Sequence, residues 1–156
     1  MNLQPLNVSE CRSLYETWCE SDRKIREEAI RLLRWTDETE HAASITFSDA
    51  AQQLRRFQDF LSAHFEDEDQ LSERFGRFYD DPHPELDAMR RQADRDHRLL
   101  LGRLDHLIEK LSAANPVYES WKEAEAEISF WVDQLEQHED QESKSLSVLF
   151  PSWSEE

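Results

Sequence analysis

The chain is poor in glycine, which accounts for only two of its 156 residues. Tight turns and β-bulges depend on glycine, so its scarcity argues against a fold made of many short strands. Leu, Ala, Glu, Arg and Gln are abundant, and β-branched runs are few. The five prolines lie near the ends or in expected connections, where they delimit helices without interrupting them. This composition predicts an all-α fold.

Cysteine is equally scarce. Cys11 and Cys19 are the only two, eight positions apart on one expected helix, which is too far apart for an unstrained disulfide. They therefore indicate free thiols in a reducing compartment. The first residues, MNLQPLNVSE, lack the basic segment and apolar run of a signal peptide, and no stretch approaches the roughly 20 apolar residues that cross a bilayer. We expect a cytoplasmic protein without a membrane span.

Positive charge is also in deficit. The chain has 18 lysines and arginines against 35 acidic residues, a formal net charge of −17. Such a surface repels phosphate backbones and anionic lipids, so we expect neither nucleic acid nor a membrane surface as a partner. The same field attracts cations, although acidity by itself most often serves solubility.

Four segments show apolar residues at alternating steps of three and four, the pattern of a helix with one core-facing stripe. We expect the second helix to begin through Ser48 or Asp49 and to end near Gly76. The fourth is expected to start at Asn115 and Pro116, with proline at the favoured first helical position. Four long helices joined by three connections predict an antiparallel up-down four-helix bundle.

The length of the chain suits one domain with a sizeable core, and it is short for two. We expect a single four-helix domain over residues 1–156. Its core should cover about residues 8–150, and a short, loosely held C-terminal tail should follow.

Ionisable side chains interrupt the stripes where the period demands core residues. They are Asp22 in the first segment, His64 and Glu68 in the second, His97 in the third, and His138 and Glu142 in the fourth. The two H-x-x-x-E pairs are 74 positions apart, and Asp22 and His97 are 75 apart. The chain therefore resembles two helical hairpins, each with one single ionisable residue and one His–Glu pair.

A metal site explains why such groups would be buried. An isolated buried carboxylate costs several kcal/mol unless its charge is compensated. The i, i+4 spacing projects His and Glu from one helix face, and mixed imidazole and carboxylate ligands suit iron, manganese or zinc. Because two such sets face each other, the pattern predicts a dinuclear centre.

Each motif also has a simpler interpretation. A single H-x-x-x-E is often a solvated ion pair, and Asp22 can instead cap a helix or pair with an arginine. The neighbouring acidic residues are expected on solvated faces: Glu66, Asp67, Asp69, Glu139 and Asp140.

At these residues the chain resembles the hemerythrin-like, HHE cation-binding family over nearly its whole length. That family is a four-helix bundle with a non-heme di-iron centre. Its pattern is a histidine on the first helix, H-x-x-x-E on the second, histidine on the third, and histidine with a following carboxylate on the fourth. The resemblance implies that His64, Glu68, His97, His138 and Glu142 hold two iron ions, with both glutamates bridging. Manganese or zinc are the alternatives.

The chain departs from the family pattern at three positions. Asp22 stands in place of the first-helix histidine, while Ala93 and Ser143 replace a histidine and an aspartate of the oxygen-carrying members. The implied ligand set is thus three histidines and three carboxylates. Anionic oxygen ligands stabilise ferric iron, which favours iron oxidation or sensing over reversible oxygen carriage.

Our first hypothesis is a di-iron protein that binds or reacts with O₂ or a similar small diatomic or peroxide ligand, in sensing or iron handling. The alternative is a non-catalytic helical interaction module whose metal site is lost or purely structural. A zinc or manganese hydrolytic site is a third option, but no nucleophile accompanies the cluster. The sequence leaves enzymatic activity and the oligomeric state open.

Overall fold

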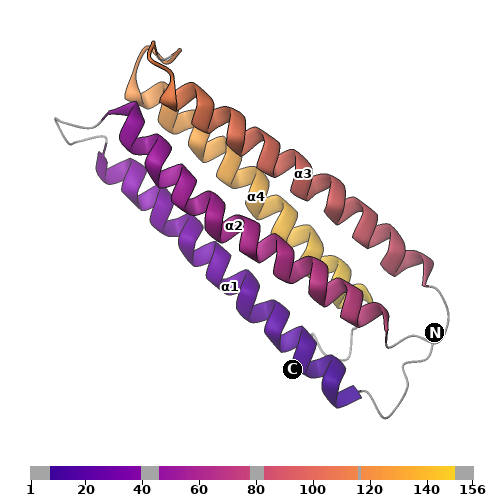
Figure 1. Ribbon diagram of the computed structural model, residues 1–156. Coiled ribbons are helices and arrows are strands. Elements are labelled where there is room, and N and C mark those ends of the chain that lie inside the picture. Colours follow the sequence, from indigo (N-terminus) through magenta and orange to yellow (C-terminus); the bar gives the residue numbers. More distant parts are fainter. Residues whose placement is uncertain (1–7, 40–45, 78–82, 116, 150–156) are drawn as a thin grey trace.

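The protein is an antiparallel bundle of four long helices, seen here in a computed structural model that describes residues 8–39, 46–77, 83–115 and 117–149. The helices are α1 (Val8–Thr39), α2 (Phe47–Gly76), α3 (Pro84–Ser112) and α4 (Trp121–Leu149). They run alternately up and down the long axis of the molecule (Figure 1). The prediction of an all-α, up-down four-helix bundle is confirmed.

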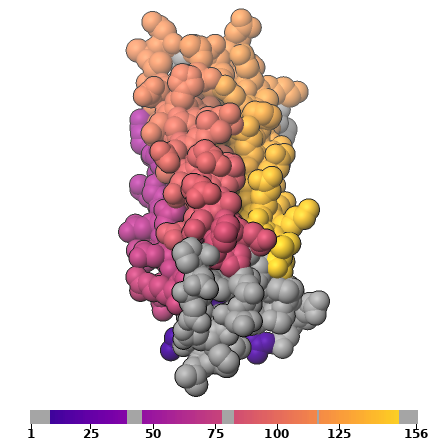
Figure 2. All heavy atoms as spheres, turned by 90° about the vertical axis from the view of Figure 1, so that its right-hand side faces the viewer, coloured from indigo at the N-terminus to yellow at the C-terminus, as the bar shows by residue number. Residues whose placement is uncertain are grey.

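The helices form a ring in which α1 contacts α2 and α4, and α3 contacts the same two neighbours. Figure 2 shows the face on which α3 lies between α2 and α4. Two apolar cores fill the ring. The larger includes Ile25, Phe57, Leu61, Leu104, Trp131 and Leu135, and the smaller includes Trp18, Leu71, Phe75, Leu86 and Leu146. The stripes of three and four therefore do face the bundle interior, with a break between the two cores.

The start of α2 differs from the prediction. Thr46, and neither Ser48 nor Asp49, is the N-cap. The Thr46 hydroxyl accepts a hydrogen bond from the Asp49 backbone N–H at 3.2 Å, and the Asp49 carboxylate accepts one from the Thr46 N–H at 3.1 Å. This reciprocal pair satisfies two helix-end donors, which is why the helix begins at Phe47, directly after Thr46. The predicted end at Gly76 is confirmed.

The predicted start of α4 at Asn115 and Pro116 is wrong, because the helix begins at Trp121. The Ser120 hydroxyl accepts a hydrogen bond from the Glu123 N–H at 3.3 Å, and the Glu123 carboxylate accepts one from the Glu119 N–H at 3.0 Å. This S-x-x-E cap, and not the proline, therefore determines where α4 begins. Pro116 itself and the expected loose tail from residue 150 onward lie outside the described residues.

The structure can be compared with two further sequence predictions, one about the cysteines and one about membrane spans. Cys11 and Cys19 are both free thiols, Cys11 buried and Cys19 exposed, as their spacing predicts. None of the helices in the described ranges combines the length and apolar character needed to cross a membrane.

Candidate metal centre

Three histidines and three glutamates meet in the bundle interior, between the two apolar cores. They are His64 and Glu68 from α2, His97 from α3, and His138, Glu139 and Glu142 from α4. None of these side chains is more than 12% exposed. Six ionisable groups withdrawn from water at one level of a bundle require compensation by charge or hydrogen bonding.

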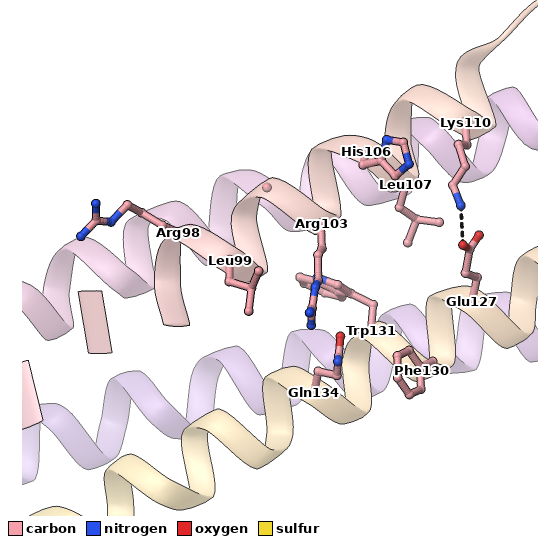
Figure 3. Close-up of a pocket in the computed structure, with 11 residues that line it drawn as sticks. Arg98, Leu99, Arg103, His106, Leu107, Lys110, Glu127, Phe130, Trp131 and Gln134 are labelled. Carbon is pink, nitrogen blue, oxygen red and sulfur yellow. Dashed lines mark hydrogen bonds and ion pairs between the residues drawn. The ribbon is translucent and has the colours of Figure 1, made fainter. Parts of the chain in front are cut away.

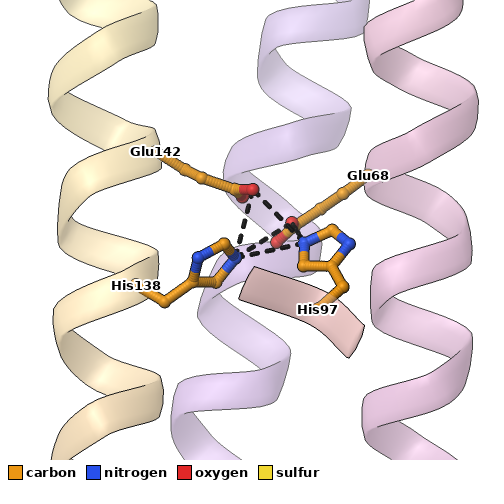
Figure 4. Close-up of side chains that lie close together, drawn as sticks. All are labelled: Glu68, His97, His138 and Glu142. Atoms are coloured by element: carbon orange, nitrogen blue, oxygen red, sulfur yellow. Dashed lines mark hydrogen bonds and ion pairs between the residues drawn. The ribbon is translucent and has the colours of Figure 1, made fainter. Parts of the chain in front are cut away.

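Four of these residues form a first group, Glu68, His97, His138 and Glu142, whose candidate ligand atoms all lie within 4.8 Å of one another (Figure 4). His97 Nε2 is 3.0 Å from Glu68 Oε2, and His138 Nε2 is 3.1 Å from Glu142 Oε1. The two Nε2 atoms are 3.1 Å apart. Ligands bound to one ion at about 2.0–2.2 Å are separated by roughly 3–4 Å, so this spacing suits a single cation.

A second group joins His64, Glu68 and Glu139. His64 Nε2 lies 2.8 Å from Glu139 Oε1 and also contacts Glu68 Oε1. Glu68 thus presents Oε1 to the second group and Oε2 to the first. His64 and Glu68 reach a common point because residues four apart lie on one face of a helix. A carboxylate shared in this way is the arrangement expected of a ligand that bridges two ions.

Polar neighbours orient two of the imidazoles from behind. The Nδ1 of His64 hydrogen-bonds the hydroxyl of Ser21 on α1 at 2.9 Å. The Nδ1 of His138 hydrogen-bonds Asp96 Oδ2 on α3 at 3.1 Å. Holding Nδ1 in this way turns Nε2 toward the carboxylates, which is how metal-binding histidines are usually positioned.

His97 is held mainly by an aromatic ring. Phe65 stacks on it with ring centroids 3.8 Å apart and meets His138 edge to face at 5.7 Å. On the outer side, Asp69 Oδ1 lies 3.4 Å from His97 Nδ1. The Phe65 ring therefore fixes two candidate ligands and covers them on the side of the larger apolar core.

Burial and the neighbouring carboxylates shift the pKa values of the three imidazoles in opposite directions. Burial lowers the pKa of His64, but its hydrogen bonds with Glu139 and Glu68 outweigh burial and raise the pKa to about 10. The same balance between burial and carboxylates raises the pKa of His97 to about 9 and that of His138 to about 11. Protons and metal ions therefore compete for the same imidazole nitrogens.

The same buried environment shifts the pKa values of the three carboxylates in different directions. Burial raises the pKa of Glu68, but hydrogen bonds with Glu142 and with the histidines hold it well below the ordinary value. Burial raises the pKa of Glu139 to about 8, against the lowering effect of His64. Burial and the neighbouring Glu68 raise the pKa of Glu142. The ionised form is therefore favoured more strongly for Glu68 than for Glu139 or Glu142.

The residues fit a pair of metal ions. Two buried carboxylate oxygens, Glu139 Oε2 and Glu142 Oε2, accept no hydrogen bond from any described residue. Buried acceptors without donors are costly, and a cation is the partner that they lack. The mixed imidazole and carboxylate donor set suits iron, manganese or zinc.

The structure brings together five of the six predicted ligands: His64, Glu68, His97, His138 and Glu142. It does not bring Asp22 into either group. Both oxygens of Asp22 accept hydrogen bonds from Arg26 Nε, at 3.1 and 3.0 Å. Arg26 also donates to Asp140 of α4 at 2.9 Å, so Asp22 belongs to an ion-pair network beside the centre.

Glu139 is the residue that the sequence analysis missed. Its expected place on a solvated face is wrong, because the residue is only 1% exposed. A signal existed: Val132, Leu135, Glu139, Glu142 and Leu146 follow steps of three and four in α4. Because α4 buries a face wider than one line of residues, both His138 and Glu139 point inward.

Two cavities reach the candidate ligands from outside. One of about 570 Å³ between α3 and α4 borders His138 and Glu142. Another of about 220 Å³ between α1 and α2 borders His64 and Ser21. A small molecule or ion could approach each group by its own route.

The fold and site define a four-helix-bundle protein with a cation-binding core. The family model described as the hemerythrin HHE cation-binding domain matches residues 13–151, which include all six side chains. The chain belongs to this hemerythrin family. No curated protein and no solved structure matches the chain significantly.

Glu139 and Asp22 can be distinguished by matched substitutions. We expect Glu139→Gln to lower the metal content from about two ions per chain to about one, because the second group loses one of its three ligands. Asp22→Asn should leave the content unchanged, because Asp22 faces Arg26. Elemental analysis of both purified variants checks this. Metal loss in Asp22→Asn with retention in Glu139→Gln would reverse the assignment.

Proposed function

We propose that the protein is a non-heme di-iron protein that binds or reacts with O₂ or a related small oxidant. One observation carries this proposal: two groups of buried ligands share the single carboxylate of Glu68. In the proposed assignment His97, His138 and Glu142 would hold one ion, His64 and Glu139 would hold the other, and Glu68 would serve both.

The two groups are unequal. The first offers four protein ligands and the second only three. A site with fewer protein ligands keeps more positions open for an outside molecule, as in metal sites that react with substrates. The cavity beside His64 and Ser21 lies at this second group. We expect the small ligand to approach there.

Iron would supply electrons for the reduction of an oxidant, which no side chain of the cluster provides. The protein's own residues hold and shield the pair. Ser21 and Asp96 keep two imidazoles oriented through Nδ1. Phe65 covers His97 and His138 with an apolar ring, which keeps water away from the two imidazoles on the side of the larger core.

The ligand set favours reaction over reversible carriage. Three carboxylates and three imidazoles donate more negative charge than a histidine-rich set, so they stabilise the ferric state. We therefore propose iron handling or oxidant sensing. The free cysteines fit a reducing compartment, so a cytoplasmic location remains our expectation.

Aerobic iron loading tests the function. Addition of about two equivalents of Fe²⁺ to metal-free protein in air should produce the near-ultraviolet absorption of a coupled diferric pair. Oxygen uptake should accompany the change. We expect Glu68→Gln to show neither, because both groups lose their shared ligand.

Two results would contradict the proposal. One is a featureless spectrum at full iron occupancy, which would indicate iron held at separate sites. The other is a chain that takes up zinc or manganese but oxidises no iron, which would leave a structural site in a helical interaction module.

A further inference from the structure

A long groove runs between α3 and α4, outside the metal centre (Figure 3). Its volume is about 670 Å³, within the range of roughly 300–1,000 Å³ typical of small-molecule sites. None of the candidate metal ligands is among the residues that line it. These are Arg98, Leu99, Gly102, Arg103, His106, Leu107, Lys110, Glu127, Phe130, Trp131 and Gln134.

The α3 wall of this groove is cationic. Arg98, Arg103 and Lys110 line it over about 18 Å of the helix. Arg98 Nε donates to the Asp94 carbonyl at 3.3 Å and Lys110 donates to Glu127, which leaves the Arg103 guanidinium for an outside group. The chain as a whole carries a formal charge of −17, whereas the α3 residues that line this groove include no carboxylate. A local positive field on an acidic protein selects an anionic group.

The only acid in the lining is already occupied. Both oxygens of Glu127 accept hydrogen bonds, one from Lys110 Nζ and one from the Tyr118 hydroxyl. Arg103, by contrast, has no hydrogen-bond or ion-pair partner among the residues that the structure describes. Its side chain extends from α3 toward Trp131 and Gln134 of α4 (Figure 3). A guanidinium without a carboxylate partner is available to an outside anion.

The remaining lining is apolar. Leu99 is 51% and Phe130 is 63% exposed, one on each wall, and the buried Trp131 and Leu107 lie between the helices. Gly102 contributes open space, because no atom lies within 4 Å of where its Cβ would stand. An exposed leucine and phenylalanine on facing walls provide contacts for an apolar body.

We propose that this groove binds a small organic anion with an apolar body, such as an aromatic or aliphatic carboxylate or sulfonate. The anionic group would pair with Arg103, and the apolar body would lie against Phe130, Leu99 and Trp131. Charge complementarity decides the class of ligand, since a neutral apolar molecule would leave Arg103 without a partner. The volume favours a small molecule over a helix of a partner protein.

The test compares two dyes that share a ring system. 8-Anilinonaphthalene-1-sulfonate carries the anion, and N-phenyl-1-naphthylamine lacks it. We expect the full-length, metal-loaded protein to bind the sulfonate dye with enhanced fluorescence. Arg103→Glu should weaken that affinity at least tenfold, and Arg103→Lys should largely preserve it. Phe130→Ser should weaken the binding of both dyes.

Arg56→Glu on α2 is the matched control, because Arg56 also lies over an exposed aromatic ring, that of Phe60, at 5.9 Å. It should not change the affinity for the sulfonate dye. Equal affinity in wild type and Arg103→Glu would overturn the proposal. So would a dimer in sedimentation analysis that is lost in Phe130→Ser, because the groove would then be an interface between copies of this chain.

Discussion

Replacement of Glu68 by glutamine should abolish the binding of both metal ions. Glu68 is the only residue common to the two groups of candidate ligands in the described part of the chain. The amide keeps the size of the side chain but removes the negative charge and one of the two acceptor oxygens. We therefore expect the metal content to fall from about two ions per chain to nearly none.

Glu66→Gln supplies the control, since Glu66 lies on the same helix and is exposed. Its metal content should match that of the wild type. Elemental analysis gives the content, and circular dichroism verifies that each variant remains helical. If Glu68→Gln kept one tightly bound ion, Glu68 would be a terminal ligand and the two groups would be independent sites.

Much of the fold could be predicted because a single physical pattern specifies it. Leu54, Leu61, Leu104 and Leu111 are spaced so that each helix buries one face, and the structure buries all four. His64 and Glu68 could be recognised in the same way, because burying a polar side chain costs free energy unless it has a partner. The pairing of helices then follows from short connections.

The rest depends on the rotation of each helix, which a stripe does not specify to within one residue. A small rotation of α4 brings Glu139 inward beside His138. The rotation of α1 places Ser21 beside His64 and leaves Asp22 beside Arg26. The two groups hold three histidines and three carboxylates, with Glu139 of α4 in the place that the sequence analysis gave to Asp22 of α1. Their role as metal ligands stays a prediction.

The groove between α3 and α4 was beyond the reach of sequence reasoning for a related cause. Arg103 and Phe130 each look like ordinary surface residues on their own helices. Only the packing of α3 beside α4 brings them to one cavity. Sites made by side chains from two outer faces have no local signature, whereas a buried histidine has one.

Chelation of the metal should lower the melting temperature by about 10 °C or more at pH 8, with a smaller effect at pH 6. Ions that bind only the folded state stabilise it by about 4 kcal/mol per site at a free concentration a thousandfold above Kd. For a chain of this size each kcal/mol corresponds to roughly 2–4 °C.

The pH dependence of the stability follows from the direction of the pKa shifts. The pKa values of His64, His97 and His138 are raised to about 10, 9 and 11, and that of Glu139 to about 8. Groups with raised pKa values stabilise the folded state below their ordinary pKa and lose that contribution as pH rises through the folded value. The metal-free protein should therefore lose stability from about pH 4.5 upward through Glu139, and more steeply from about pH 6.5 upward through the three histidines. Glu68 acts oppositely, because its lowered pKa removes stability only in acid.

Metal-bound protein should show the reverse slope over the same range. Protons compete with the ions for the imidazoles and carboxylates, so affinity and stability rise with pH. Melting curves with and without chelator, at pH 6, 7 and 8, should separate progressively. Glu68→Gln should give a single curve at each pH, because it holds no metal to remove. If wild-type curves also coincide with and without chelator, the buried cluster is maintained by its own protons and the chain is a helical module without a functional metal.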